Sequence, residues 1–319
     1  MLFDVKHYKV PNRYPWTKDF IKAMWQGFWT ADKFSFTSDV YDFKHVLTKK
    51  ERKVIIRTLA AIAQIELAVK RFWSNLGNNL PDPNIESLGI VMAHVEEIHS
   101  DAYEKLLHTL GLSHEINGIL RNQIMRDRLW ALNHMAETDY SDYKKGFLIS
   151  LINFTIFIEN VSLFSQFYII LWFNRYKGVL KDTAQQIKYT RNEETLHAQV
   201  GFKLIRTLRN EYPNLLDEED IEIIKRAADL AFVTECKMIK FILSDYKNDN
   251  LNTRLLQEFV RNRIKMSLDE LDINWCKKTI DTEPFKWMDE GVYATAKVDF
   301  LNSEPVAYTQ FDLSHEDDF

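Results

Sequence analysis

The 319-residue chain is 46% hydrophobic and has only nine glycines and seven prolines, which gives it enough apolar material for one large core and few residues that break helices. A net charge of −5 leaves no broad basic face, so nucleic acid is not an expected partner. The two cysteines, Cys236 and Cys276, have neither a CxxC nor a metal-ligand spacing and indicate reduced thiols in a cytoplasmic protein.

Apolar residues recur with helical periodicity over long stretches that end where turn residues cluster. In chain order, we expect helices over residues 49–76, 85–110, 116–135, 141–176, 183–210, 218–245 and 253–270. No repeat, low-complexity segment or shift in composition divides residues 1–300, which we predict to form a single helical domain. Residues 301–319 lack core-forming periodicity and are rich in acids, as is typical of a flexible acidic C-terminal tail.

One stretch, residues 151–173, resembles a membrane span because it is apolar on every side. It contains Glu159, and an ionised carboxylate at the centre of a helix facing lipid is costly. A helix that is apolar all round can instead lie at the centre of a protein core. We therefore predict a core helix and no membrane association, which leaves the role of Glu159 to be explained.

Two Glu-x-x-His pairs stand far apart in the chain, each inside a predicted helix: Glu96 with His99, and Glu194 with His197. Residues three apart lie on one face of a helix, so each pair presents a carboxylate and an imidazole in the same direction. Two more acids stand alone among apolar neighbours on two other predicted helices, Glu66 and Glu159. Four helices carrying these side chains have the ligand set of a di-metal four-helix bundle.

The alternative is that these acids are solvated or paired with surface cations, which is the common fate of a single Glu-x-x-His. A carboxylate buried alone is expensive, however, and usually has a cation beside it. Carboxylate and imidazole ligands suit iron or manganese, and the absence of cysteine near them argues against structural zinc. The sequence therefore predicts an all-α, ferritin-like helical bundle with a di-metal carboxylate site in a central four-helix core.

Two further side chains share the faces of these ligands. Tyr103 follows His99 by four residues, and it is either a core tyrosine with a satisfied hydroxyl or a one-electron donor beside an oxidising metal pair. Lys70 follows Glu66 by four residues. It either reaches solvent or a surface acid, or it is a cation that draws an anionic oxidant such as superoxide towards the metals.

Taken together, these residues resemble the small, radical-generating subunit of class I ribonucleotide reductase, and the resemblance covers nearly the whole chain. It is carried by the six candidate ligands and by other residues of the family pattern: Trp29 in Phe28-Trp29-Thr30-Ala31-Asp32, the run Asn192-Glu193-Glu194-Thr195-Leu196-His197, the stretch Lys286-Trp287-Met288-Asp289-Glu290, and Tyr308 in the acidic tail. A generic ferritin has the four-helix ligands without this tryptophan and tail.

The resemblance implies a mechanism in which the metal pair stores a one-electron oxidant, on the metals or on Tyr103. The oxidising equivalent travels through Trp29 and Tyr308 to a cysteine of the large subunit, where it starts the reduction of ribonucleotides to 2′-deoxyribonucleotides. Glu193 stands where the family has an aspartate that links the metal-bound His99 to the tryptophan. The resemblance also implies that the tail docks on the large catalytic subunit and that the chain forms a homodimer.

Four departures from the commonest family pattern bear on the metal. Glu66 and Glu193 stand where most members have aspartate, Asn192 replaces an arginine, and Lys70 is atypical. The Glu first ligand together with Lys70 resembles the subclass that assembles two Mn ions with superoxide and keeps the oxidant on the metals. The alternative is a tyrosyl radical on Tyr103 beside two Fe or two Mn ions, or a mixed Mn/Fe pair.

Two rival functions share the predicted ligands. One is another ferritin-like di-metal oxidase or desaturase that acts directly on a lipid-like substrate and needs no partner. The other is metal storage in an oligomeric shell, which has no use for a disordered acidic tail. Trp29 and the tail argue for the reductase subunit over both.

Overall fold

The computed structural model describes residues 1–136 and 141–288, except for the side chains of residues 66–68, 135 and 136. The described part is helical and contains no strand. Its α-helices are α1 (Trp16–Gln26), α2 (Thr37–Tyr41), α3 (Lys49–Ser74), α4 (Leu76–Asn79), α5 (Pro83–Thr109), α6 (Ser113–Leu120), α7 (Gln123–Ala136), α8 (Tyr143–Asn153), α9 (Phe164–Lys177), α10 (Lys181–Glu211), α11 (Glu218–Ile242) and α12 (Thr253–Asp269). Shorter elements are η1 (Ala31–Lys33), η2 (Asp42–Val46), η3 (Phe154–Ser162) and η4 (Glu283–Met288).

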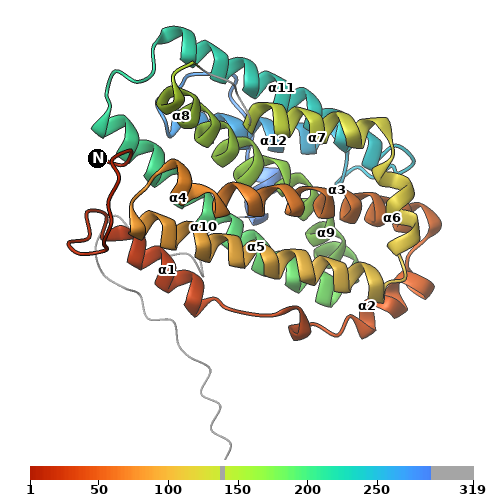
Figure 1. Cartoon of the computed structure of the whole chain (residues 1–319). Coiled ribbons are helices and arrows are strands. Elements are labelled where there is room, and N and C mark those ends of the chain that lie inside the picture. The colour runs from red at the N-terminus through yellow and green to blue at the C-terminus, as the bar shows by residue number, and fades with distance from the viewer. Residues whose placement is uncertain (137–140, 289–319) are drawn as a thin grey trace, which may run out of the picture.

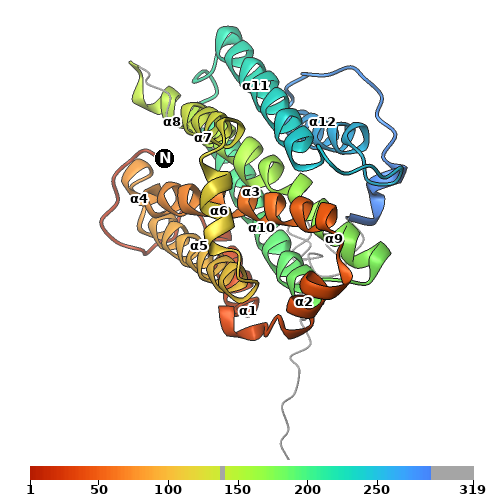
Figure 2. The ribbon, with the colours of Figure 1, turned by 90° about the vertical axis from the view of Figure 1, so that its right-hand side faces the viewer.

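Four helical segments surround the centre of the bundle, and one of them is the continuous run of η3 and α9. Helix α3 packs against α5, α5 packs against α10, α10 packs against η3 and α9, and these pack back against α3. Figure 1 shows α1 along the outer side of α5, with α7 and α11 on the opposite side of the molecule, and Figure 2 shows α12 beside α11 in the turned view. The centre is thus enclosed on both sides by further helices, which keeps water from it.

Local sequence explains where the core helices begin. Thr48 and Glu51 form a reciprocal capping box at the start of α3, so two otherwise unsatisfied backbone N–H groups are bonded. Asp82 accepts the N–H of Asn84 at the start of α5, where Pro83 occupies the first helical position and needs no hydrogen bond of its own. These caps set the register with which α3 and α5 present their side chains to the centre.

The central apolar segment is continuous from α8 through η3 to α9. Residues Tyr143–Lys177 are long and apolar enough to cross a membrane by length and composition alone, but 89% of the most apolar window is buried inside the bundle. The prediction of a core helix rather than a membrane span agrees with this burial. Its middle is a π-helix, Phe154–Ser162, which the periodicity did not predict. A π-turn widens the helix and re-aims the side chains that follow it.

Most predicted helices are present within a few residues of their expected ends. The stretch 116–135 is two helices, because α6 ends at Leu120 and α7 begins at Gln123. Helix α1 was not predicted, although it packs along α5. The all-α, ferritin-like fold is confirmed, while the predicted domain end at residue 300 and the tail 301–319 lie outside the described residues.

Candidate metal centre

Five of the six predicted ligands come together at the centre of the bundle. Helix α5 carries Glu96 and His99, α10 carries Glu194 and His197, and the π-helix carries Glu159. Each of these side chains is completely buried. Glu66 lies in α3, the fourth core element, but its side chain is outside the described part of the structure.

The distances among these side chains are those of a shared site. His197 Nδ1 lies 2.7 Å from Glu96 Oε1 and 3.6 Å from both Glu159 Oε2 and Glu194 Oε2. His99 Nδ1 lies 3.3 Å from Glu96 Oε2 and 3.2 Å from Glu194 Oε1. One ligand atom from each of Glu96, Glu159, Glu194 and His197 falls within 4.8 Å of the others. Both imidazoles therefore point their Nδ1 atoms at the same group of carboxylates.

The hydrogen bonding of this group fits a site built for metal ions. Both carboxylate oxygens of Glu96 and of Glu194, one of Glu159, and both ring nitrogens of His197 lack a hydrogen bond of good geometry to any other described group. Buried polar atoms are almost always bonded, and buried charges are paired or bind metals. Three carboxylates and two imidazoles, with no cysteine among them, suit iron or manganese and can hold a di-metal pair.

In the metal-free cluster, burial and the neighbouring charges shift the pKa values of the candidate ligands. Burial, followed by repulsion from Glu194 and Glu96, raises the pKa of Glu159 well above its usual value. Burial opposes charge on His197, but Glu96 and the other carboxylates outweigh it and raise the pKa of this imidazole. The carboxylates around His99 raise its pKa in the same way. Metal ions must displace protons from this cluster when they bind, because ligands bind metals in their deprotonated forms.

A hydrogen-bonded line runs from this cluster towards the surface. His99 uses its other ring nitrogen, Nε2, to contact Glu193 Oε2 at 2.8 Å. The indole N–H of Trp29 donates to both oxygens of Glu193, at 3.0 and 2.9 Å. Trp29 is itself buried, with 3% of its surface exposed. Glu193 therefore bridges the imidazole and the tryptophan, and it fixes which nitrogen of His99 faces the cluster.

The other predicted functional residues have different settings. Tyr103 is buried in α5, one helical turn beyond His99. Lys70 forms an ion pair with Glu97, whose side chain is half-exposed, so its ammonium lies towards the outside of the bundle. Tyr308 lies outside the described residues. The structure thus places Tyr103 near the candidate ligands and shows a surface acid as the described partner of Lys70.

Sequence reasoning missed Trp73, which touches the cluster directly. Its indole N–H donates to Glu159 Oε1 at 2.6 Å, and its ring centre lies 6.2 Å from that of His197. Trp73 follows Glu66 by seven residues, so helical spacing alone places both on the same face of α3. A fully buried tryptophan whose N–H meets a candidate ligand holds that carboxylate in one orientation.

A buried ion pair behind the π-helix was missed as well. Arg128 of α7 is completely buried and donates to Glu235 of α11 at 2.8 Å. Its other nitrogens donate to the carbonyl oxygens of Ala61, at 2.7 Å, and Ser162, at 2.5 Å. Ser162 ends the π-helix that carries Glu159, so the guanidinium bonds a carbonyl that the wider helix leaves free.

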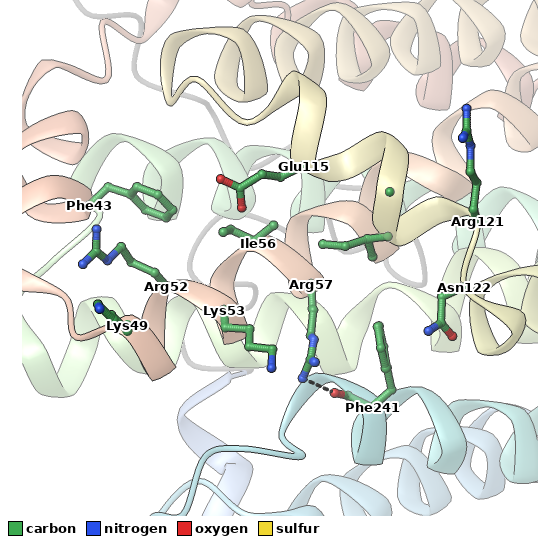
Figure 3. A pocket seen from close by; sticks show the side chains of 12 residues that line it. Phe43, Lys49, Arg52, Lys53, Ile56, Arg57, Glu115, Arg121, Asn122 and Phe241 are labelled. Carbon is green, nitrogen blue, oxygen red and sulfur yellow. Dashed lines mark hydrogen bonds between the residues drawn. The ribbon is translucent and has the colours of Figure 1, made fainter.

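The pocket of about 820 Å³ in Figure 3 lies away from the candidate ligands. It is lined by residues of α3, α6 and α11, among them Lys49, Arg52, Lys53 and Glu115. Arg57 closes one side by donating to the carbonyl oxygen of Phe241 at 2.8 Å. None of the candidate metal ligands lines this pocket, so it is a separate, solvent-facing feature.

A helical bundle whose core elements bring carboxylates and imidazoles to one buried point defines a ferritin-like, di-metal carboxylate protein. The model of the protein family "Ribonucleotide reductase, small chain" matches residues 7–276 of this chain. The chain therefore belongs to the ribonucleotide reductase small-chain family, and the family and enzyme class predicted from the sequence are confirmed.

Curated relatives are named as subunits of ribonucleoside-diphosphate reductase. The chain is similar to the ribonucleoside-diphosphate reductase subunit beta of Treponema pallidum, with 20% identity over 307 residues that cover 93% of this chain and 86% of the relative. A second relative, the subunit beta of Halalkalibacterium halodurans, is 21% identical over 281 residues, or 86% of this chain and 80% of the relative.

Solved structures show the same fold. The putative class I ribonucleotide reductase of Bacillus halodurans superimposes with a TM-score of 0.79, 20% identity, and coverage of 86% of this chain and 99% of that chain. The dimanganese(II)-NrdF of Streptococcus sanguinis gives a TM-score of 0.72, 16% identity, and coverage of 91% and 99%. An R2-like ligand-binding oxidase with a Mn/Fe cofactor gives 0.68, 18% identity, and coverage of 84% and 98%.

Proposed function

We propose that this chain is the small subunit of a class I ribonucleoside-diphosphate reductase, active together with a large catalytic subunit that reduces ribonucleotides to 2′-deoxyribonucleotides. The observation that carries the proposal is the line from the buried carboxylate–imidazole cluster through Glu193 to Trp29. A storage protein or a self-contained oxidase needs the cluster but has no need of a tryptophan bonded to it from the outer side.

The position of each residue indicates the role that we propose for it. Glu66, Glu96, His99, Glu159, Glu194 and His197 would hold two metal ions, which when bound supply a one-electron oxidant. The carboxylate of Glu193 accepts the N–H of Trp29 and the N–H of His99, so the indole is held in a fixed relation to the centre. Burial of Trp29 keeps water from its ring, which protects an oxidised indole from side reactions.

The proposed metals are two Mn ions activated by superoxide. Support comes from the glutamate at position 66, from Lys70 one turn further along α3, and from the likeness to a dimanganese(II) protein of the same fold. Lys70 would act as a cation near the outer end of the site that attracts an anionic oxidant. The alternative is a tyrosyl radical on Tyr103 beside two Fe or two Mn ions, or a mixed Mn/Fe pair. A sharp tyrosyl signal in the paramagnetic spectrum of active protein would establish that radical.

The proposal extends to partners and compartment. Residues 301–319 would dock on the large subunit as an acidic peptide, and Tyr308 within them would pass the oxidising equivalent across the contact. The subunit would form a homodimer in the cytoplasm. These assignments rest on family membership and on the composition of the tail.

Removal of residues 303–319 tests the reductase assignment. We expect unchanged metal content and helix content, and complete loss of nucleotide reduction in an assay with the large subunit. A synthetic peptide with the sequence of residues 303–319 should inhibit the full-length protein by competing for the same surface. Retained reduction by the shortened protein, with no inhibition by the peptide, would refute the docking assignment.

The likeness to R2-like ligand-binding oxidases keeps a second function open to test. In that case the chain would oxidise a bound apolar ligand without a large subunit, and substitution of Trp29 by Phe would leave the activity unchanged. Under the reductase proposal, Trp29→Phe abolishes nucleotide reduction while the metal content is retained. The two functions therefore predict opposite results for one substitution.

A further inference from the structure

Trp29 is enclosed, so an oxidising equivalent that reaches it needs a way out to the surface. Its side chain is 3% exposed, and its ring packs against two aromatic rings besides that of His99. The ring centre of Tyr189 lies 5.7 Å away at an interplanar angle of 56°, and that of Phe34 also lies 5.7 Å away. Of these two neighbours, only the tyrosine has a ring that is readily oxidised by one electron with loss of a proton.

Tyr189 occupies a position from which it can serve both Trp29 and solvent. It lies in α10 four residues before Glu193, so the two side chains follow one another on one face of the helix. Glu193 takes the N–H of the Trp29 indole, while Tyr189 packs against its ring. The side chain of Tyr189 is half-buried, in contrast to the indole. One helix thus supports the tryptophan on its inner side and offers it a phenol on its outer side.

We propose that Tyr189 is a redox-active relay that carries the oxidising equivalent from Trp29 to the surface of the subunit. The inference rests on the proposed function, because the one-electron oxidant comes from the metal centre. In the step itself, the phenol of Tyr189 loses one electron to the oxidised indole and its O–H proton to water. Trp29, oxidised as a radical cation that has kept its N–H, takes up that electron and returns to the neutral indole.

Lys33 sets how long an oxidised Tyr189 lasts. Its ammonium lies 5.0 Å from the centre of the Tyr189 ring, which is a cation–π contact. Such a contact stabilises the electron-rich phenol ring more than the oxidised ring, which has less electron density to offer the cation. The cation therefore opposes accumulation of the radical and favours its onward transfer, as a relay requires. Replacement of Lys33 by Met should make the radical at position 189 longer-lived.

The test uses the complete two-subunit enzyme with Tyr189→Phe, which removes only the hydroxyl. We expect loss of nucleotide reduction with unchanged metal content, unchanged thermal unfolding, and unchanged affinity for the large subunit. Tyr41→Phe is the matched control, because Tyr41 is an exposed tyrosine of α2, and it should leave the activity unchanged. Full activity of Tyr189→Phe would overturn the relay.

A spectroscopic measurement separates the relay from a purely structural role. With 3-aminotyrosine at position 189, mixing with the large subunit and substrate should trap a radical at this residue, visible by electron paramagnetic resonance. Absence of that signal in protein that carries the oxidant would overturn the inference even if Tyr189→Phe is inactive. If the unsubstituted protein reduces no nucleotide, the proposed function fails instead, so the two failures are distinguishable.

Discussion

Gly201 of α10 lies one turn beyond His197 and packs against Thr155 of the π-helix. A Cβ at this position would approach three side-chain atoms of Thr155: Oγ1, Cγ2 at 2.5 Å, and Cβ at 2.8 Å. Thr155 in turn precedes Glu159 by four residues, so both partners in this contact are one turn from a candidate metal ligand. Gly201→Ala therefore tests how closely the two ligand-bearing elements must approach each other.

The expected cost follows from these distances. Carbon atoms in contact prefer separations of about 3.5–4.0 Å, so the new methyl group forces a shift of roughly 1 Å. Overpacking of this kind costs about 1–3 kcal/mol. Alanine is the better residue inside a helix by about 1 kcal/mol, which offsets part of the cost. We expect a net loss of up to about 2 kcal/mol in the free energy of unfolding of the metal-free protein.

Urea unfolding and metal titration measure the two consequences. Affinity for Mn should fall, because the shift separates Glu159 from His197. In a Thr155→Ala background the loss should be smaller, since two of the three crowded atoms are gone, although Cβ at 2.8 Å remains. Gly118→Ala in α6 is the control: no atom lies within 4 Å of its added Cβ, and it should leave stability unchanged or raise it. A Gly201→Ala protein as stable as the unsubstituted protein, with equal metal affinity, would refute the reasoning.

Three further substitutions test separate parts of the structure. Trp73→Phe removes the donor to Glu159 and should cost about 1–3 kcal/mol in metal-free protein, measured by urea unfolding; an unchanged midpoint would contradict this. Lys70→Met should leave the metal content intact and slow activation by superoxide. If the variant and the unsubstituted protein are activated at equal rates, Lys70 serves only in its surface ion pair with Glu97. Hydrogen bonds from Lys145 and from the backbone N–H of Asp220 lower the pKa of Asp217 from 3.8 to about 2. The ionised carboxylate of Asp217 therefore stabilises the fold above pH 3.8, and this stabilisation is lost as the pH falls towards 2. Asp217→Asn should remove that pH dependence in acid unfolding, whereas an identical acid profile would show that Asp217 does not contribute.

The sequence predicted five of the side chains that the structure brings together, because helical spacing is regular. Glu96 with His99, and Glu194 with His197, face one way whatever the rest of the fold does. Glu159 was conspicuous because it stood in an apolar segment, where an acid needs a partner. Tertiary structure then had only to bring these faces together, and the fold places their ligand atoms 2.7 to 3.6 Å from one another.

Other features were beyond sequence reasoning because they depend on contacts between distant segments. The sequence carries no periodic signal for the π-helix. The Ser162 carbonyl oxygen at its end accepts a hydrogen bond from Arg128, 34 residues earlier in the chain. The spacing from Glu66 places Trp73 on the same face of α3, but only the fold brings its N–H to Glu159. Tyr189 and Trp29 are 160 residues apart in the chain, and nothing in the local sequence of either residue indicates their contact.

The buried guanidinium of Arg128 has a consequence for how the molecule opens. It bonds α3, the end of the π-helix and α11 at once, from a position in α7. If one of these segments moves away, the buried guanidinium of Arg128 loses a partner, at a cost of about 3–5 kcal/mol. Amide hydrogens around the centre should therefore exchange slowly, because an opening there must first break this set of bonds.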